Sequence, residues 1–297
     1  EMIWVLGCRG MLGSQLCELF QKNKIAYTGT GSEVDVADFS KLENFANKLE
    51  IGSGSKIDFI VNCSAYTAVD KAEDEKESAQ KINSAGPLNL ARIAEKKGAA
   101  IIHISTDYVF DGNAVQPILE TEKKSPASVY GKTKASGEDN IISSTQRYYI
   151  LRTAWLYGFY GKNFVYTMTK AMNSRESVRV VCDQKGTPTN CSTLAQVIFE
   201  ICNKKTVPYG IYNVTDAGQT TWFDFCREIY SLGTKYGRIS NNCVINSCTT
   251  DDYPVKAKRP AYSVLDTSKI QSALNIKLPD WKLSLEDFIK DERFSVK

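Results

Sequence analysis

A tyrosine and a lysine stand one helical turn apart in the stretch SPASVYGKTKASGE, at Tyr130 and Lys134. A tyrosine with its ordinary pKa of about 10 is a weak proton donor at neutral pH, and a nearby ammonium group would lower that pKa. The stretch ISTDYVFDG places the Thr106 hydroxyl after an apolar run, where it can hydrogen-bond a carbonyl oxygen. Since ketone reduction needs a hydride on carbon and a proton on oxygen, the three side chains together indicate a carbonyl reductase.

Each of these signals has an ordinary explanation when it is taken alone. The chain contains 15 tyrosines and 37 lysines and arginines, so a chance pairing like that of Tyr130 with Lys134 is expected. A Ser-Thr-Asp sequence is common at helix N-caps and turns, which is an alternative role for Ser105 and Thr106. The surrounding elements have to decide between these interpretations.

A glycine-rich loop, GCRGMLG, follows the first apolar run and opens the first amphipathic segment. Its glycines, Gly7, Gly10 and Gly13, permit a tight turn, a close approach of the backbone to a pyrophosphate and close helix–strand packing. The N-terminus of the following helix would supply N–H donors to the phosphates. The loop therefore predicts a dinucleotide-binding site at the start of the chain.

The choice of dinucleotide depends on the end of the second predicted strand, in AYTGTGSEVD. NAD sites usually carry an acid there, but this chain has Thr30 beside two glycines, and its nearest acids, Glu33 and Asp35, come later. Arg9 in the glycine-rich loop is well suited to bind a 2′-phosphate. These features favour NADPH, with NADH as the alternative, and the simplest alternative for Arg9 is a solvated side chain.

Short apolar runs alternate with amphipathic segments through the first half of the chain. This alternation is typical of a parallel sheet with helices on both faces, so we predict an α/β, Rossmann-type doubly wound fold. The predicted strands are 2–7, one that begins the stretch 25–31, 57–65, 99–106, 148–158 and 210–216. The predicted helices are 11–24, 40–50 with Ser40 as N-cap, 77–98 and the segment around Tyr130.

The alternation loosens after Gly158. We therefore predict a dinucleotide-binding domain over 1–157, with a returning segment near 192–216. The segments 158–191 and 217–297 would form a smaller, discontinuous C-terminal lobe that binds the substrate. Such a lobe usually closes a cleft at the carboxyl ends of the parallel strands.

Composition argues against several kinds of partner and site. The net charge is +3 and the basic residues are scattered, so nothing indicates nucleic acid or a membrane surface. No apolar run approaches the roughly 18 residues of a transmembrane helix, and the first residues are typical of a strand rather than a signal peptide. The nine cysteines include no C-x-x-C pair, and several lie in apolar runs, which indicates a reducing cytoplasm.

His103 is the only histidine in the chain. A two-histidine metal site is therefore excluded, and a Ser-His-Asp triad would depend wholly on this residue. Because His103 lies in the apolar stretch AAIIHIST, we interpret it as a core residue rather than a catalyst. Proton transfer would then fall to tyrosine, lysine or a carboxylate.

A series of motifs over nearly the whole chain is similar to the extended short-chain dehydrogenase/reductase family, and within it to reductases of 4-keto nucleotide sugars. The motifs are GCRGMLGSQL, DVADFS, VNCSAYTAVDKAE, STDYVFDG, SPASVYGKTKASGE, LRTAWLYG, DQKGTPT, GIYNVTDAG and RPAYSVLDTSKI. The resemblance implies reduction of the 4-keto group of dTDP-6-deoxy-L-lyxo-4-hexulose to dTDP-L-rhamnose with NADPH or NADH. The rhamnose would serve cell-surface polysaccharide biosynthesis.

The resemblance also implies roles for individual residues. The catalytic residues would be Tyr130 as proton donor, Lys134 as its partner, and Thr106 beside the carbonyl. The implied cofactor-binding residues are Gly7, Arg9, Gly10, Met11, Leu12, Gly13, Thr30, Asp38, Phe39, Cys63, Ala65, Tyr66 and Lys134. The implied substrate-binding residues are Thr106, Asp107, Tyr130 and Trp155, and we expect the stretches KGTPT and KRPAYS to line the cleft.

Two departures from the family pattern affect these expectations. Gly29 falls where NADH-using relatives often carry an aspartate, which favours NADPH. Gln15 falls where some members carry a glutamate that helps bind magnesium between subunits, so we expect no metal and a monomer or weak homodimer. Two alternatives stay open: a reductase of another 4-keto sugar nucleotide, and a non-catalytic NADP-binding regulatory subunit like the methionine adenosyltransferase β-subunit.

Overall fold

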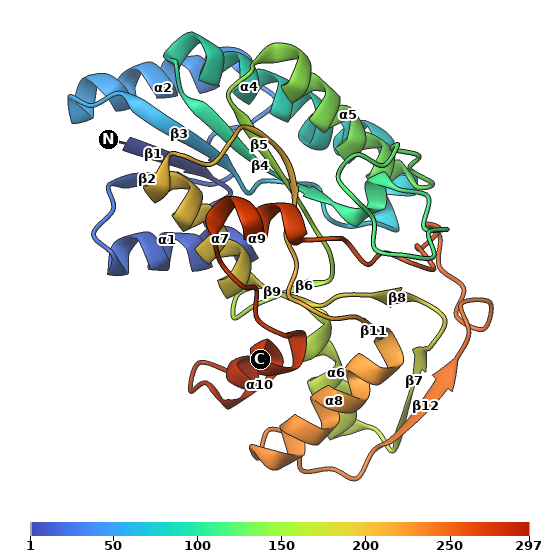
Figure 1. Ribbon diagram of the computed structural model, residues 1–297. Coiled ribbons are helices and arrows are strands. Elements are labelled where there is room, and N and C mark those ends of the chain that lie inside the picture. Colours follow the sequence, from blue (N-terminus) through green and yellow to red (C-terminus); the bar gives the residue numbers. More distant parts are fainter. Residues whose placement is uncertain (1, 297) are drawn as a thin grey trace.

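A six-stranded parallel sheet forms the centre of the larger part of the molecule in the computed structural model, which describes residues 2–296 (Figure 1). Its strand order is β10-β5-β4-β3-β1-β2, and every pairing is parallel. The strands are β1 (Met2–Leu6), β2 (Tyr27–Thr30), β3 (Ile57–Asn62), β4 (Ala100–Thr106), β5 (Tyr148–Thr153) and β10 (Gly210–Asn213). The order reverses between β1 and β3, and such a switch point opens a ligand crevice at the carboxyl ends of the strands.

Helices cover both faces of this sheet (Figure 1). One face carries α1 (Met11–Lys22), α7 (Cys191–Lys204) and α9 (Ser268–Leu274). The other carries α2 (Phe39–Ser53), α4 (Gly86–Lys97) and α5 (Val129–Ser144). The predicted α/β class with a parallel sheet is confirmed.

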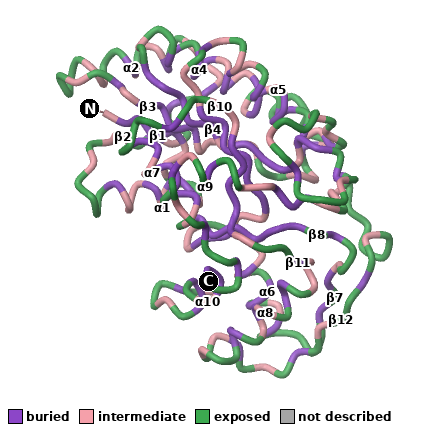
Figure 2. Tube along the Cα trace, viewed as in Figure 1, coloured by how far each residue is buried: buried purple, intermediate pink, exposed green. Residues whose placement is uncertain are grey.

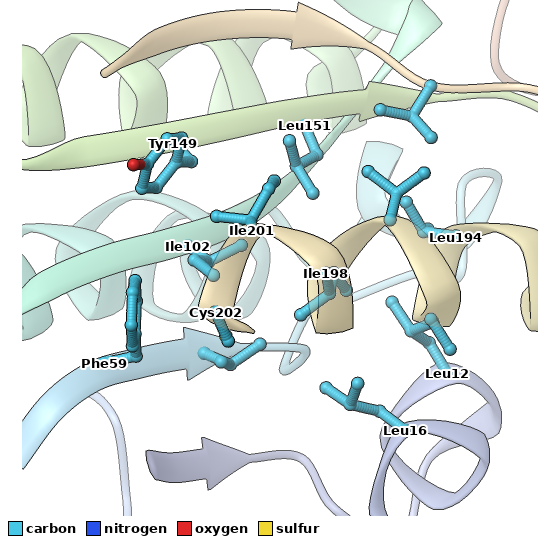
Figure 3. Close-up of a cluster of buried hydrophobic side chains, with 14 of the residues drawn as sticks. Leu12, Leu16, Phe59, Ile102, Tyr149, Leu151, Leu194, Ile198, Ile201 and Cys202 are labelled. Atoms are coloured by element: carbon cyan, nitrogen blue, oxygen red, sulfur yellow. The ribbon is translucent and has the colours of Figure 1, made fainter. Parts of the chain in front are cut away.

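Alternating side chains of the sheet build two separate apolar layers. On the α1 and α7 side, Leu16, Leu151 and Ile198 lie in one buried cluster (Figure 3). On the other side, Trp4 and Ile101 pack under α2 and α4. Because strand residues alternate between faces, burial on both faces needs nearly continuous apolar strands, and Figure 2 shows the sheet buried throughout its centre.

The second, smaller part of the molecule has its own apolar core, with Val165, Met172, Phe225 and Phe288 among its fully buried members. Its helices are α6 (Phe164–Ser174), α8 (Trp222–Lys235) and α10 (Trp281–Lys290). Short strand pairs complete it: β6 (Leu156–Tyr157) with β9 (Thr189–Asn190), β7 (Ser177–Val181) with β12 (Val244–Cys248), and β8 (Lys185–Gly186) with β11 (Thr220–Thr221).

Several predicted elements differ from those in the structure, and the strands predicted over 57–65 and 210–216 end earlier, at Asn62 and Asn213. Asp38, rather than Ser40, caps α2, because its carboxylate accepts a hydrogen bond from the Lys41 N–H at 3.0 Å. The predicted helix 77–98 is divided into α3 (Lys76–Gln80), a π-helical turn (Lys81–Ala85) and α4. Pro87, which has no N–H to donate, lies directly after this π-helical turn, at the start of α4.

The strand predicted over 148–158 is also too long. It ends at Thr153, since Trp155 has a φ of 47°, in the left-handed region that a strand cannot contain. Between residues 2 and 296, no helix combines the length and apolar character needed to cross a bilayer.

Candidate active site

The first turn of α5 carries Tyr130 to the carboxyl end of β4. Ser128 begins the helix by accepting the Gly131 N–H on its hydroxyl at 3.1 Å. A Cβ at Gly131 would lie 2.2 Å from the Tyr108 carbonyl oxygen, in the 3₁₀ turn η3 (Asp107–Val109) that follows β4. The glycine next to Tyr130 is therefore what allows α5 to approach the end of β4 so closely.

Thr106 is the last residue of β4 and faces this turn. Its hydroxyl accepts the Tyr108 N–H at 3.2 Å and donates to Asp107 Oδ1 at 2.9 Å. Burial raises the pKa of Tyr130, and a hydrogen bond with the Thr106 side chain opposes that rise. The structure thus brings Thr106 and Tyr130 together from segments that are separated by a long loop.

Lys134 occupies a different place from the one that the sequence analysis expected. Its ammonium donates to the Ile104 carbonyl at 2.5 Å and lies 3.3 Å from His103 Nε2. The pKa of Tyr130 is raised, and Lys134 is not among the groups that shift it. The expectation that Lys134 lowers the tyrosine pKa is wrong for this conformation, because the ammonium is held against β4.

Asp107 is a buried carboxyl beside Thr106 and Tyr130. Burial raises its pKa to about 6, against hydrogen bonds from Thr106 and Ser263 that lower it. Ser263 comes from the KRPAYS stretch, and a Cβ at Gly112 would lie 2.5 Å from Pro260 of the same stretch. The C-terminal part of the chain therefore reaches the end of β4, on the side where Tyr130 lies.

The glycine-rich loop between β1 and α1 has the shape that a pyrophosphate requires. Gly7 has a φ of 73°, and a Cβ there would lie 2.8 Å from the Ser64 nitrogen. A Cβ at Gly13 would lie 2.1 Å from the Gly7 carbonyl oxygen. Gly10 caps α1 without any side-chain hydrogen bond, and the first intrahelical N–H donor is that of Ser14, so the N–H groups of the first turn before Ser14 stay available to a ligand. This cradle fits a dinucleotide.

Arg9 extends from this loop toward the end of β2 and forms an ion pair with Glu33. Glu33 also accepts the Gly31 N–H at 2.7 Å, and this bond, followed by Arg9, lowers its pKa to about 2. A Cβ at Gly31 would lie 2.2 Å from Arg9 Nη2. The Arg9 guanidinium therefore lies next to Gly31 in an ion pair, although 66% of its side chain is exposed.

Glu33 is a residue that sequence reasoning did not assign. Glu33 comes several residues after the expected end of the second strand, so the sequence did not indicate that it would accept hydrogen bonds from the ribose. In the folded loop, its carboxylate turns back and contacts Arg9. At the same strand end, Thr30 accepts the Trp4 indole N–H at 2.9 Å, so its hydroxyl points into the core. A Cβ at Gly29 would lie 2.8 Å from Cys8 Cβ.

The other predicted cofactor residues lie around the same crevice. Tyr66 donates its backbone N–H to Asn83 Oδ1 at 2.8 Å and its hydroxyl to Glu75 at 2.6 Å. Asn83 also donates to Thr133 on α5, which ties the Tyr66 loop to the helix that carries Tyr130. The predicted residues take these places: Cys63 and Ala65 follow β3, Asp38 and Phe39 begin α2, and Met11 and Leu12 begin α1, with the Leu12 side chain in the core.

Trp155 follows β5 and stacks on Trp222 at the start of α8, with ring centroids 3.6 Å apart and an angle of 12° between the planes. A Cβ at Gly186 would lie 2.5 Å from the Trp155 ring, so the indole is held between α8 and the KGTPT stretch. The sequence analysis did not assign Trp222, and no local pattern could have paired Trp222, or Gly186 of the KGTPT stretch, with Trp155.

A buried ion pair joins α5, the helix that carries Tyr130, to strand β5. Arg152 donates to both carboxylate oxygens of Glu138, at 2.9 and 2.7 Å, and Ser105 donates to Glu138 at 2.6 Å. Burial raises the pKa of Glu138, but Arg152 and Ser105 outweigh it, and the net shift is downward. Within residues 2–296, no three His, Cys, Asp or Glu side chains gather as they would around a metal ion.

Comparisons with known proteins agree with this geometry. The model of the RmlD substrate binding domain family matches residues 1–294. The dTDP-4-dehydrorhamnose reductase of Aggregatibacter actinomycetemcomitans is 40% identical to this chain over 290 residues, which cover 95% of this chain and 96% of that protein.

Two solved structures are similar over almost their whole length. A dTDP-4-dehydrorhamnose reductase from Clostridium acetobutylicum superposes with a TM-score of 0.90 at 37% identity, covering 97% of this chain and 98% of the other. One from Bacillus anthracis, solved in complex with NADP, gives a TM-score of 0.88 at 32% identity with the same coverage.

Proposed function

Because this chain belongs to the RmlD substrate binding domain family, we propose that it reduces the 4-keto group of dTDP-6-deoxy-L-lyxo-4-hexulose to dTDP-L-rhamnose with NADPH. The product would serve nucleotide-sugar and cell-surface polysaccharide biosynthesis. One observation carries the proposal: Thr106 and Tyr130 meet at the carboxyl end of β4, next to a glycine cradle that fits a dinucleotide.

The two parts of the molecule take different ligands in this proposal. The dinucleotide lies on residues 1–157, with the returning segment 192–216, at the switch point beside β1. The sugar nucleotide lies on the lobe formed by 158–191 and 217–297. Trp155, held by Trp222 and Gly186, provides a flat apolar wall for the sugar ring.

Tyr130 donates the proton that the 4-keto oxygen needs once it becomes an alkoxide. Its raised pKa keeps the phenol protonated at neutral pH, so it is a donor and not a base before the reaction. The Thr106 hydroxyl hydrogen-bonds the same oxygen and stabilises the developing charge. NADPH, when bound, supplies the hydride, and Lys134 holds its ribose and returns a proton to Tyr130.

Cofactor binding in this proposal uses the residues around the crevice. Gly7, Gly10 and Gly13 admit the pyrophosphate, and Arg9 binds the 2′-phosphate in place of Glu33. We place the adenine and the nicotinamide between the neighbouring loops, on Met11, Leu12, Thr30, Asp38, Phe39, Cys63, Ala65 and Tyr66. We further propose a cytoplasmic monomer or weak homodimer.

The test is NADPH oxidation with enzymatically prepared dTDP-6-deoxy-L-lyxo-4-hexulose, comparing the wild type with Tyr130→Phe. We expect turnover in the wild type and a loss of roughly a hundredfold or more in the variant, the order expected for removal of a general acid. NADPH should bind both proteins equally. Equal turnover by both would refute the role of Tyr130.

Two other results would change the substrate or the role that we propose. Turnover only with a different 4-keto sugar nucleotide would keep the chemistry and change the sugar. Tight NADPH binding without turnover on any such sugar, together with co-purification of a larger enzyme, would instead indicate a regulatory subunit.

A further inference from the structure

His103 is fully buried in β4 and has polar side chains on both of its ring nitrogens. On one side, Asn62 of the neighbouring strand β3 lies with its amide nitrogen 3.0 Å from His103 Nδ1. On the other side, Lys134 Nζ lies 3.3 Å from Nε2. The only histidine of the chain therefore stands between a strand-end amide and the lysine of the active site.

The orientation of the Asn62 amide follows from its other contacts. Its oxygen lies 3.1 Å from the Ser64 backbone nitrogen and 2.5 Å from the Ser64 hydroxyl. A backbone N–H can only donate, so the atom that it meets has to be the amide oxygen. The amide nitrogen consequently faces His103 and donates, and Nδ1 carries a lone pair.

This arrangement places the histidine proton on the side of Lys134. Burial, with the charge of Lys134, lowers the pKa of His103 well below its usual value, so the ring is neutral and its single proton lies on Nε2. An ammonium group has three donors and no lone pair, so it cannot accept the Nε2–H, whereas a neutral amine can. The contact thus favours the neutral amine of Lys134.

The surroundings of Lys134 both raise and lower its pKa. Burial is the largest influence and lowers the lysine pKa to about 8, while Glu138 on α5 and Cys63 after β3 raise it. The Ile104 carbonyl accepts from either form of the lysine at 2.5 Å. His103 presents a ring N–H to the lysine nitrogen, whereas Ile104 presents a carbonyl acceptor.

We propose that His103 is a positioning residue for Lys134: oriented by Asn62, it presents Nε2–H to the lysine and thereby keeps the lysine proton exchangeable near neutral pH. The inference rests on the proposed function, because an exchangeable proton matters only if Lys134 resupplies Tyr130 during reduction. Its consequence is that His103 determines where reduction fails as the pH rises.

The first test needs no substrate. In protein labelled with ¹⁵N-histidine, the single histidine gives two ring-nitrogen signals, and we expect the neutral tautomer protonated on Nε2 from pH 6 to pH 9 (roughly the range around an unperturbed histidine pKa). The Nε2 signal should shift as Lys134 titrates, and Lys134→Met should abolish that shift while keeping the tautomer. An imidazolium, or a proton on Nδ1, would overturn the inference.

The second test follows the pH dependence of kcat. In His103→Gln, the amide oxygen can accept from the ammonium, so the alkaline limb of kcat should move upward by about one pH unit, a tenfold change in the lysine equilibrium. Asn62→Asp should act in the same direction, because a carboxylate accepts a hydrogen bond from Nδ1–H, which favours the tautomer protonated on Nδ1 and leaves the Nε2 lone pair facing Lys134. Ser64→Ala is the matched control: the backbone N–H still orients Asn62, and the limb should stay in place.

The outcomes separate this inference from the proposed function. An unmoved alkaline limb in both folded variants, with wild-type turnover intact, overturns the role of His103 only. Absence of wild-type turnover overturns the proposed function, and the histidine signals still report the tautomer. If His103→Gln does not fold, the pH dependence of kcat in Asn62→Asp and the ring-nitrogen signals of the labelled wild type still test the role of His103.

Discussion

Trp155 and Trp222 stack face to face at 3.6 Å, although one follows a strand of the central sheet and the other begins a helix of the smaller lobe. Trp155 also holds a φ of 47°, which a bulky residue adopts only when its surroundings impose it. The stack therefore joins the two parts of the molecule at the place where we propose that the sugar binds.

Removing Trp222 should loosen Trp155 and weaken substrate binding. An aromatic pair contributes about 0.5–1.5 kcal/mol beyond its buried area, so Trp222→Ala should raise the KM for the sugar nucleotide roughly tenfold, with a smaller effect on kcat. Steady-state kinetics measure this, and near-ultraviolet circular dichroism reports loss of the coupled indoles. Trp222→Phe keeps a ring against Trp155 and should lie close to the wild type. An unchanged KM in Trp222→Ala would contradict the role.

Arg9 and Glu33 should determine the affinity for the 2′-phosphate. Arg9→Ala should weaken NADPH binding by about tenfold or more, the order of a charged hydrogen bond, and leave NADH binding nearly unchanged. Glu33→Gln should instead tighten NADPH binding severalfold, since the competing carboxylate is gone while the Gly31 N–H keeps its acceptor. Fluorescence titration with both cofactors measures these affinities, and equal losses for NADPH and NADH would show that Arg9 does not contact the phosphate.

An aspartate at position 29 should not by itself convert the protein to NADH. A Cβ there would lie 2.8 Å from Cys8 Cβ and 3.1 Å from its sulfur, so the new carboxylate would be displaced from the ribose. The double variant Gly29→Asp/Cys8→Gly opens that space and should gain NADH affinity while it loses NADPH affinity. The single variants serve as controls in calorimetric titrations. A single Gly29→Asp variant that already prefers NADH would show that Cys8 moves freely.

Breaking the buried Glu138–Arg152 pair should strongly destabilise the fold. Glu138→Ala leaves the Arg152 guanidinium buried without its carboxylate, and such a change costs about 3–5 kcal/mol of unfolding free energy. The double variant Glu138→Leu/Arg152→Met removes both charges and should recover most of the loss. Urea unfolding measures both, and a double variant as unstable as the single one would contradict this explanation.

Asp216 should make stability depend on pH. Burial raises its pKa to about 6 in the folded state, above the ordinary value of 3.8. The protonated carboxyl therefore favours the folded state at low pH, and this contribution is lost as the pH rises from about 4 to about 6. Relative to the wild type, Asp216→Asn should gain about 3 kcal/mol of unfolding free energy between about pH 4 and about pH 7.

Urea unfolding at several pH values tests this last expectation. Asp251→Asn removes the same charge from an exposed side chain and is the matched control. If the difference in unfolding free energy between Asp216→Asn and the wild type stays constant with pH, burial does not raise the pKa of Asp216 in the folded state.

Local patterns were sufficient for the elements and for the chemical classes of the site. The apolar runs predicted the parallel strands, and the spacing of Gly7, Gly10 and Gly13 predicted a loop in which a Cβ at Gly7 or Gly13 would overlap the neighbouring backbone. These inferences succeed because strand burial, glycine backbone freedom and helix periodicity act within a few residues.

Boundaries were less certain because competing caps lie close together. Both Asp38 and Ser40 can cap α2, and only the folded backbone showed that Asp38 reaches the Lys41 N–H. The end of the strand at Thr153 depended on the positive φ of Trp155, which contacts with the smaller lobe impose.

The α/β class, the dinucleotide loop and the residue types of the active site could all be predicted from the sequence, since these depend on local backbone and side-chain chemistry. The contacts of the charged groups could be read only from the folded chain: Glu33 contacts Arg9, and Lys134 contacts His103 rather than Tyr130. Electrostatic and hydrogen-bond partners come from segments far apart in the chain, and burial of each pair sets its strength. For that reason, the direction of a pKa shift could not be predicted from spacing alone.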